Sequence, residues 1–372
     1  MSEATTPKIE IPQLEPFLGQ EEISEVVDCI RTNWLTEGPK SARFVQLLQQ
    51  YTGAKHILLI PNGTLALYVA LKVAGLGAGD EVIVPDFTFF ASGSSVVLAG
   101  ATPVFVDIEP GTLNIDPEQI RKAISSRTKA IMPVHIYGQA ANMDVVMELA
   151  EENNLAVIED AAQGIGVFYR ERHVGTIGDL GCLSFFADKT MTTGEGGAIL
   201  TNDDGLAEKV LYFKNQGRLN RGSFVHPFMG YNFRLTDIQS AIGIAQMKRL
   251  PELIERKQRA DARYRESLAD LSQIQFLSDA PGSNRVPFRI GILVPEAEPL
   301  SHHLTNAGIG LRSFFYPMHR QPAFTPGNSR ALPGIRHSVH GYEHGICLPS
   351  SASLTDSQID FICEQIREFY ED

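Results

Sequence analysis

Short apolar runs alternate with helix-like segments between residues 57 and 201, and this alternation constrains the fold more than any other feature. The apolar runs are expected to be strands, at 57–60, 81–84, 102–106, 130–134, 156–159, 182–185 and 198–201. Amphipathic stretches of helical length lie between them, at 90–99, 116–124 and 143–153. Apolar strands separated by helices predict a largely parallel sheet covered on both faces. The sequence therefore predicts an α/β fold.

The pattern of expected helices and strands changes near residue 250, and this change marks the predicted domain boundary. An apolar helix is expected at 238–247 and a long charged helix at 251–271. Shorter strands and helices follow, and segment 321–340, rich in proline, glycine, arginine and histidine, is expected to be an exposed loop. We predict a large domain at 1–250 and a smaller C-terminal α+β domain at 251–372.

Composition excludes several classes of function. The 372 residues have a formal net charge of −12, which argues against a nucleic-acid or anionic-membrane surface. No apolar run approaches the length of a membrane span. The histidines show no metal-site spacing, and the cysteines form no Cys-x-x-Cys pair: Cys29, Cys182, Cys347 and Cys363. We expect no metal and a cytoplasmic protein.

Lys189 stands in a distinctive setting, within Ser184-Phe-Phe-Ala-Asp-Lys-Thr-Met-Thr-Thr-Gly-Glu-Gly-Gly197. Hydroxyl residues and three glycines surround this one amine, directly before the strand-like run. A surface lysine needs no such surroundings. An amine that forms a Schiff base needs a sharply bent backbone, room for a flat ring and hydroxyls for a phosphate. Together with Asp160, the pattern points to pyridoxal 5′-phosphate (PLP).

Asp160 directly follows the strand expected at 156–159. Ligands of open α/β sheets bind at the carboxyl ends of strands, and a buried carboxylate there needs a partner. The protonated pyridine nitrogen of PLP supplies that partner, and the ring then acts as an electron sink. Taken alone, Asp160 is better explained as a helix N-cap before Ala161.

Further cofactor candidates are less specific. Gly63-Thr64 lies between a strand and a helix, where free N–H groups and the helix dipole favour a phosphate. Without Lys189, an ordinary strand–helix turn explains it better. The Ser184 hydroxyl can reach the same phosphate, although buried strand serines are common. Phe89 can stack on a flat ring, but periodicity does not separate it from Phe87 and Phe90.

Two polar segments lie nearer the C-terminus. Segment 230–237 is dense in polar groups before the helix at 238–247, and a helix cap at Thr236 or Asp237 explains it as well. Segment 312–319 mixes aromatic rings, a cation and an imidazole. This combination suits a sugar or a nucleotide, but a hydrophobic segment of the small domain would look similar.

Together these segments resemble the DegT/DnrJ/EryC1/StrS family of PLP-dependent aminotransferases, which act on nucleotide-linked keto-sugars. The resemblance runs from Trp34 to Ser351 through ordered motifs: Asn62-Gly-Thr64, Thr88-Phe89, Glu159-Asp-Ala-Ala-Gln163, Ser184-Phe185 with Lys189, Gly194-Glu-Gly-Gly197 and Gly230-Tyr-Asn-Phe-Arg234. It implies a fold-type I PLP-dependent transferase that forms a homodimer with active sites shared across the interface.

The resemblance also assigns roles to individual residues. Lys189 would be the Schiff-base lysine, Asp160 the partner of the pyridinium, and Gln163 the neighbour of the ring hydroxyl. Many members carry His in place of Gln163. The implied phosphate and ring contacts are Gly63, Thr64, Ser184 and Phe89, with Asn232 reaching the phosphate from the other subunit.

Segments 188–197 and 312–322 resemble the GDP-perosamine synthase branch of the family. That branch aminates C4 of GDP-4-keto-6-deoxymannose with L-glutamate as donor and 2-oxoglutarate as by-product. The resemblance implies a place in O-antigen and lipopolysaccharide biosynthesis, with Lys189 as the base in both half-reactions. The implied substrate contacts are Arg312, Phe315, Tyr316 and His319.

Other functions stay open from the sequence. The acceptor can be a UDP- or dTDP-linked keto-sugar aminated at C3 or C4. An enzyme for a free amino acid or amine would need a dedicated carboxylate-binding arginine, for which Arg234 or Arg312 qualifies. A non-catalytic regulator would need a DNA-binding segment, which an acidic chain with little length before Trp34 disfavours. Related dehydratases carry His where this chain has Lys189.

Overall fold

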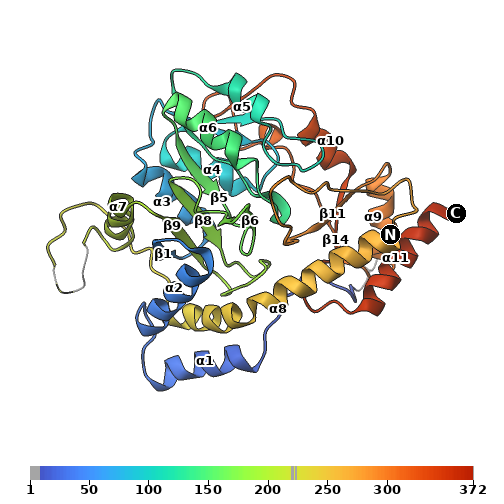
Figure 1. Ribbon diagram of the computed structural model, residues 1–372, viewed down its shortest axis with the longest axis horizontal. Helices are drawn as coiled ribbons and strands as arrows, with labels where there is room; N and C mark the ends of the chain where they lie inside the picture. Colours follow the sequence, from blue (N-terminus) through green and yellow to red (C-terminus); the bar gives the residue numbers. More distant parts are fainter. Residues whose placement is uncertain (1–8, 219–221, 223, 372) are drawn as a thin grey trace, which may run out of the picture.

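An eight-stranded sheet forms the centre of the protein in the computed structural model, which describes residues 9–218, 222 and 224–371 (Figure 1). The strand order is β1-β9-β8-β5-β4-β2-β3-β13. The strands are β1 (His56–Ile60), β2 (Glu81–Pro85), β3 (Thr102–Val106), β4 (Thr128–Ile131), β5 (Ala156–Asp160), β8 (Leu180–Ser184), β9 (Gly197–Thr201) and β13 (Arg330–Ala331). Seven of the eight strands run in the same direction, and β9, between β1 and β8, runs antiparallel to them. The predicted largely parallel α/β sheet is confirmed.

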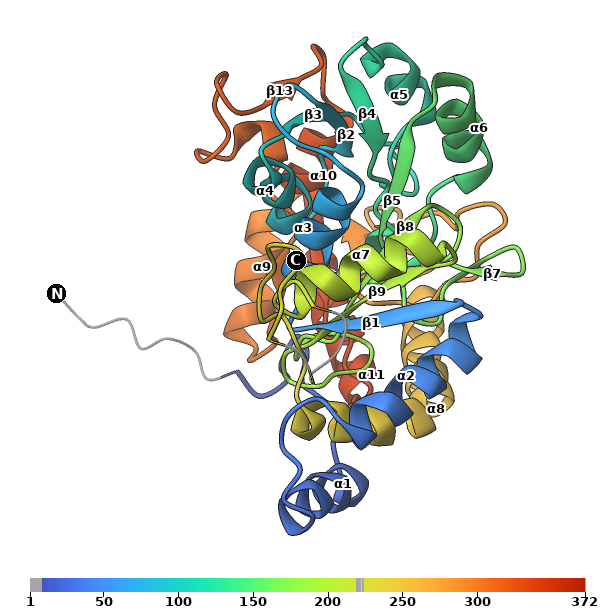
Figure 2. The ribbon, with the colours of Figure 1, turned by 90° about the vertical axis from the view of Figure 1, so that its left-hand side faces the viewer.

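Helices cover both faces of this sheet (Figure 2). One face packs against α3 (Gly63–Val73), α4 (Phe90–Ala99) and α7 (Asp204–Lys214). The other packs against α2 (Pro39–Thr52), α5 (Pro117–Ala123), α6 (Met143–Asn153) and the first half of α8 (Asp237–Ser267). Strand side chains alternate between the two cores, so that Leu59 joins one and Ile60 the other. Burial on both faces explains why the strands read as continuous apolar runs.

A smaller antiparallel sheet carries the C-terminal part of the chain. Its order is β10 (Gln275–Phe276), β11 (Ile290–Leu293), β14 (Gly345–Leu348) and β12 (Arg312–Ser313). The second half of α8, with α9 (Ala297–Asn306) and α11 (Asp356–Glu371), packs on it around a core that includes Tyr264, Ile292 and Ile346. Ile11 joins this core from the start of the chain. The remaining elements are α1 (Gln20–Arg31), α10 (His337–His344), β6 (Phe168–Tyr169), β7 (Arg172–His173) and the short 3₁₀ turns η1 (Ile136–Gly138) and η2 (Met318–Arg320).

The two helices expected on either side of Pro251 are one continuous helix, α8, with Pro251 inside it. Proline removes one backbone hydrogen bond, but Leu250 and Leu253 beside it are fully buried, and their packing outweighs that loss. Because α8 runs through the expected boundary, the division into domains at 1–250 and 251–372 stays a prediction.

The expectation of an exposed loop throughout 321–340 is wrong at its centre and at its end, where α10 begins at His337. Arg330 and Ala331 form β13, which extends the large sheet beside β3, and the Arg330 guanidinium lies 3.1 Å from the Glu81 carboxylate of β2. A two-residue strand has no periodicity to read, because its register comes from a partner more than two hundred residues away. Across the described ranges, no helix is both long enough and apolar enough to span a membrane.

Candidate active site

The carboxyl ends of β1, β2, β5 and β8 lie on one edge of the large sheet, because these four strands run in the same direction. A cavity of about 1030 Å³ opens there, between this edge and residues 288–289 and 312–316 of the C-terminal part. Ligands of open α/β sheets bind at such an edge. Most of the predicted site residues line it: Gly63, Thr64, Phe89, Asp160, Gln163, Ser184, Lys189, Arg312, Phe315 and Tyr316.

Lys189 projects into this cavity from the turn that follows β8. Its backbone N–H donates to the Phe186 carbonyl at 2.9 Å, and its Nζ lies 4.3 Å from the centre of the Phe288 ring. Burial lowers the pKa of the Lys189 amine, and the nearby Arg289 cation lowers it further, while the Asp188 and Asp160 carboxylates oppose both effects. A lowered pKa suits an amine that attacks a carbonyl or accepts a proton near neutral pH.

Asp160 presents a buried carboxylate to the same cavity. Its Oδ2 accepts a hydrogen bond from Ser92 Oγ at 2.7 Å, and its Oδ1 accepts one from the Ala162 backbone at 3.1 Å. Burial raises the pKa of this carboxyl group, although both hydrogen bonds lower it. The carboxylate therefore caps the following turn and leaves a buried negative charge that a cationic partner would balance, as the protonated ring nitrogen of PLP would.

The N-terminus of α3 faces the cavity through Gly63 and Thr64. Asn62 caps the helix, with its Oδ1 accepting from the Leu65 backbone at 2.9 Å. The dipole and free N–H groups of this end favour an anion, and the Ser184 and Thr64 hydroxyls line the same wall. An amine, a buried carboxylate and an anion-binding helix end around one cavity fit the aldehyde, ring nitrogen and phosphate of PLP.

The residues predicted to contact the cofactor ring differ in their burial and in whether they line the cavity. Phe87 is fully buried in the core, whereas Phe89 is 56% exposed and lines the cavity, so the stacking role of Phe89 stays a prediction that this position allows. Phe90 also lines the cavity but packs on Phe324, with ring centres 5.3 Å apart. Gln163 Oε1 accepts from the Tyr137 backbone at 2.7 Å, so the amide is held at the cavity wall.

Two predicted site residues do not line the cavity. His319 is bound by Asp86, whose carboxylate accepts from the His319 backbone at 2.7 Å and contacts the imidazole Nδ1 at 2.8 Å. Asn232 pairs with Asn215 in an isolated bridge, and its Oδ1 accepts from Arg234 Nε at 2.7 Å. Their roles toward substrate and phosphate stay predictions.

The structure adds residues that the sequence did not single out. Ser92 reaches Asp160 from α4, and Arg289 reaches Asp188, the neighbour of Lys189, from a segment 101 residues later. Asp188 directly precedes Lys189 in the segment 184–197, so the sequence already placed it beside the amine. Nothing in the spacing of Ser92 or Arg289 marked either of them.

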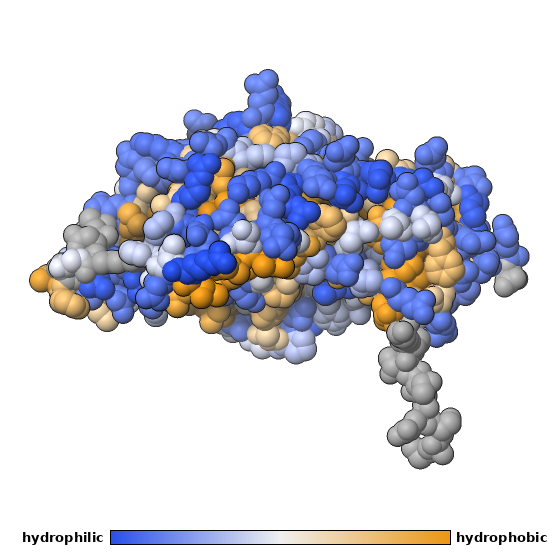
Figure 3. Space-filling view, turned by 90° about the horizontal axis from the view of Figure 1, so that it is seen from below, coloured by the Kyte–Doolittle hydropathy of each residue, from blue (hydrophilic) through white to orange (hydrophobic). Residues whose placement is uncertain are grey.

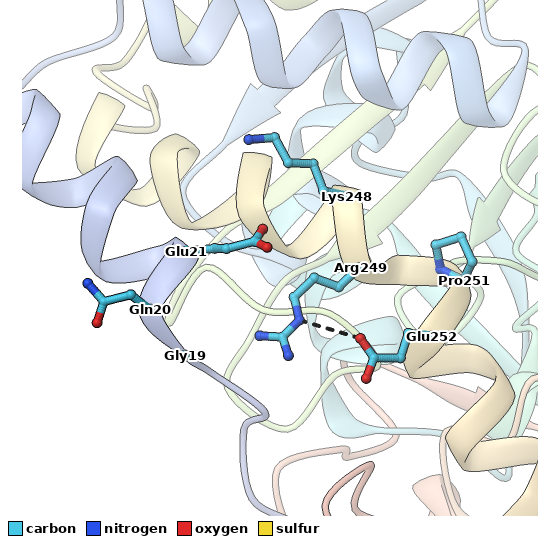
Figure 4. Close-up of a pocket in the computed structure, with 7 residues that line it drawn as sticks. All are labelled: Gly19, Gln20, Glu21, Lys248, Arg249, Pro251 and Glu252. Atoms are coloured by element: carbon cyan, nitrogen blue, oxygen red, sulfur yellow. Dashed lines mark ion pairs between the residues drawn. The ribbon is translucent and has the colours of Figure 1, made fainter.

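A second hollow, of about 550 Å³, lies between the start of α1 and the middle of α8 (Figure 4). Arg249 lies 3.9 Å from Glu252 within its lining, and 3.5 Å from Glu22 beside it. These ion pairs explain much of its polar character. None of its lining residues lines the larger cavity, and the cavity around Lys189 and Asp160 is the candidate active site.

Fold and site together define a PLP-dependent aminotransferase of fold-type I. Residues 16–367 match the family model described as the DegT/DnrJ/EryC1/StrS aminotransferase family, and the chain belongs to this family.

Named relatives cover nearly the whole chain. The GDP-perosamine synthase of Escherichia coli O157:H7 is 37% identical, over 97% of this chain and 99% of the relative. The GDP-perosamine synthase of Caulobacter vibrioides is 39% identical, over 93% and 94%. The structure of the aminotransferase Spr1654 from Streptococcus pneumoniae, in its PLP-form, superimposes with a TM-score of 0.92 at 27% identity, over 97% of this chain and 98% of that chain.

Proposed function

We propose that this protein transfers the amino group of L-glutamate to a GDP-linked 4-keto-6-deoxy sugar, GDP-4-keto-6-deoxy-D-mannose, giving GDP-perosamine and 2-oxoglutarate. Relatives named GDP-perosamine synthase at 37% and 39% identity over almost the full chain support this substrate. The observation that carries the chemistry is the buried Lys189 amine in one cavity with the buried Asp160 carboxylate.

The residues of the cavity divide the work of the reaction. When bound, PLP supplies an electron sink that stabilises negative charge on the carbon attached to the transferred nitrogen. Asp160 would hold the proton on the ring nitrogen, and the α3 N-terminus with Ser184 and Thr64 would bind the phosphate. In the first half-reaction Lys189 Nζ would move a proton from the donor's α-carbon to the cofactor, and in the second it would move a proton from the cofactor to the carbon of the sugar that receives nitrogen. Its pKa, lowered by burial, suits both directions of transfer.

The nucleotide-sugar would enter along the rim formed by segment 312–316. Arg312 and Tyr316 are exposed there, and Phe315 lies with its ring centre 6.2 Å from that of Phe89. Aromatic faces suit a sugar ring or a base, and a guanidinium suits a diphosphate. His319 would act on the substrate only through movement away from Asp86, since it lies outside the cavity.

The second part of the proposal is a homodimer in which Asn232 serves the neighbouring subunit's active site. Apolar side chains are exposed around this segment, with Met229 94% and Phe224 89% exposed, and on α1, where Ile30 is 62% exposed. Figure 3 shows apolar patches between polar side chains on the face seen from below. Exposed apolar patches of this kind favour burial against another chain.

We further propose a cytoplasmic location and a step in building O-antigen or another lipopolysaccharide sugar. All four cysteines are buried and free, as in proteins of a reducing compartment. The O-antigen assignment rests on the proposed product, an amino sugar attached to a nucleotide.

A substrate panel tests the proposed function. The purified protein, loaded with PLP, is mixed with glutamate and an acceptor, either a GDP-, UDP- or dTDP-linked keto-sugar or a free 2-oxo acid or aldehyde, and products are read by mass spectrometry. We expect the GDP-linked 4-keto sugar to be converted fastest, with nitrogen at C4 by NMR, and Lys189→Ala to form no product. Equal or faster conversion of a UDP- or dTDP-linked sugar would overturn the GDP assignment.

The attachment of the cofactor is tested separately. Borohydride reduction of the loaded protein should fix the cofactor on Lys189, as a mass increase on its peptide. Attachment to another lysine, or wild-type turnover without PLP, would overturn the role of Lys189.

A further inference from the structure

The Asp188 carboxylate lies between two cations at the base of the active-site cavity. Its Oδ2 accepts a hydrogen bond from Arg289 Nη2 at 2.7 Å, whereas its Oδ1 lies 3.7 Å from Lys189 Nζ. Among the residues described, Asp188 Oδ1 is a buried acceptor without a hydrogen-bond partner. A buried acceptor left unfilled is costly, so its place beside the Lys189 amine requires an explanation.

Arg289 fixes the position of this carboxylate. The guanidinium is almost fully buried, and its Nη1 donates to Gln13 Oε1 at 2.6 Å. Gln13 is itself anchored through its Nε2, which donates to the Leu348 carbonyl at 3.2 Å. Because Arg289 is held on one side by Gln13, its other nitrogen holds Asp188 Oδ2 in place. Asp188 Oδ1 is thereby left facing Lys189.

We propose that Asp188, held by Arg289, is a positioning residue for the Lys189 amine, an inference that rests on the proposed role of Lys189 as the base. Whenever Lys189 Nζ is not bonded to the cofactor and holds a proton, its ammonium donates a hydrogen bond to Asp188 Oδ1. The proton stays on nitrogen, and no covalent bond forms or breaks. The contact keeps the amine beside the cavity between one proton transfer and the next.

The charged groups around Lys189 shift the pKa of its amine in opposite directions. Asp188 on its own turn and Asp160 at the end of β5 raise the pKa of the amine, whereas burial and Arg289 before β11 lower it. The buried Lys257 amine on α8 also interacts with Asp188 and Arg289. Removing the Asp188 charge should therefore lower the pKa of Lys189, and removing the Arg289 charge should raise it.

The test measures the Lys189 amine in the cofactor-free protein. Limiting acetic anhydride is added across a pH series, and acetylation of the Lys189 peptide is followed by mass spectrometry. Asp188→Asn should shift the midpoint down by about one pH unit or more, as expected for the loss of a unit charge 3.7 Å from the amine nitrogen, and Arg289→Gln should shift it up. Arg289→Lys keeps the positive charge and should stay close to wild type.

A matched control comes from an ion pair far from the cavity. Arg263→Gln removes a guanidinium that lies 2.6 Å from Asp360, between α8 and α11, and should leave the midpoint unchanged. A purely structural role for Asp188 and Arg289 would lower thermal stability without moving the midpoint. Unmoved midpoints, or shifts of the same sign, would overturn the proposal.

The variants also separate this inference from the function on which it rests. If Asp188→Asn fails to fold, Arg289→Gln against Arg289→Lys decides, because only the first removes the charge. Borohydride attachment at a lysine other than Lys189 would overturn the proposed function. It would leave the acetylation midpoints interpretable as a property of the buried amine.

Discussion

A Cβ atom on Gly63 would lie 2.9 Å from the Ser184 Cβ, closer than side-chain carbons pack. The first residue of α3 therefore touches the last residue of β8, with only a hydrogen in place of a side chain at residue 63. This contact brings the anion-binding helix end to the strand that precedes Lys189. This contact, as well as the shape of the turn, therefore explains why residue 63 is a glycine.

Gly63→Ala should weaken PLP binding while leaving the fold intact. The added methyl group would push the α3 N-terminus away from Ser184, because overpacking at rigid backbone forces a shift. We expect cofactor affinity, measured by absorbance titration, to fall about tenfold, equivalent to roughly 1.4 kcal/mol. Gly77→Ala is the matched control, because a Cβ there meets no atom within 4 Å. Equal affinity in the Gly63 variant and wild type would contradict the role of this contact.

The Asp160 carboxylate should matter more for the rate than for cofactor retention. Asp160→Asn would remove the proposed charge-assisted hydrogen bond to the ring nitrogen, of a kind worth roughly 1.5–3 kcal/mol, and would leave the electron sink weaker. Both half-reactions, followed by stopped-flow absorbance, should slow by more than PLP binding weakens.

Ser92→Ala gives the milder test of the same site. It removes only the 2.7 Å hydrogen bond that lowers the pKa of Asp160, so the rate should fall less than in Asp160→Asn. Half-reactions in Asp160→Asn that run at the wild-type rate would show that the carboxylate only caps the turn.

His173 predicts how stability depends on pH. Its Nδ1 contacts the Val174 carbonyl, and its Nε2 accepts from the Gly166 backbone at 3.0 Å, so the neutral ring already uses both nitrogens. Burial lowers the pKa of His173 from 6.5 to about 4, against the attraction of the Glu159 carboxylate. The unfolded chain binds this proton more readily. The stabilisation is thus complete above about pH 6.5 and is lost as the pH falls toward 4.

The loss should reach about 3 kcal/mol by pH 4, on a scale of 1.36 kcal/mol for each pKa unit. Urea unfolding at several pH values measures it. His173→Gln keeps an acceptor for the Gly166 amide but cannot titrate, so its free energy of unfolding should depend less on pH in this window. Parallel pH profiles for the variant and wild type would assign the acid sensitivity to other groups.

The large sheet was predictable because its information is local. Strands such as β3 and helices such as α4 and α6 were expected at their observed bounds, since apolar runs, caps and periodicity lie within each segment. The continuity of α8 through Pro251 was not predictable, because the burial that maintains it comes from other elements. β13 was missed for the same reason.

The same difference between local and long-range information applies to the residues of the site. Asp160 and Lys189 follow predicted strands and Ser184 lies near the end of one, so their meeting at one sheet edge was predictable from the alternation of strands and helices. The contacts of Ser92 with Asp160 and of Arg289 with Asp188 join residues 68 and 101 positions apart. Such pairs depend on how the layers pack, which no local pattern encodes. Asn232 depends on a second subunit, and one chain cannot place it.

Mixed dimers test whether Asn232 completes the neighbouring site. Asn232→Asp places a negative charge where the phosphate would bind, and Lys189→Ala removes the base, so neither variant should be active alone. If Asn232 acts across the interface, the heterodimer has one site with both defects and one site with neither. Each heterodimer should then regain up to about half of the wild-type dimer's activity, as residue sharing across a two-fold axis requires.

The experiment needs the heterodimer to be isolated through two different tags, and its activity measured before the subunits exchange. Asn232→Ala, which removes the amide without adding charge, is the companion variant and should show a smaller loss alone. Diluting the wild-type protein should release PLP and lose activity together, because the monomer would lack one phosphate ligand. A purified heterodimer without activity would mean that Asn232 serves its own subunit's site. Full activity of Asn232→Asp on its own would mean that Asn232 only holds Arg234 through the 2.7 Å hydrogen bond.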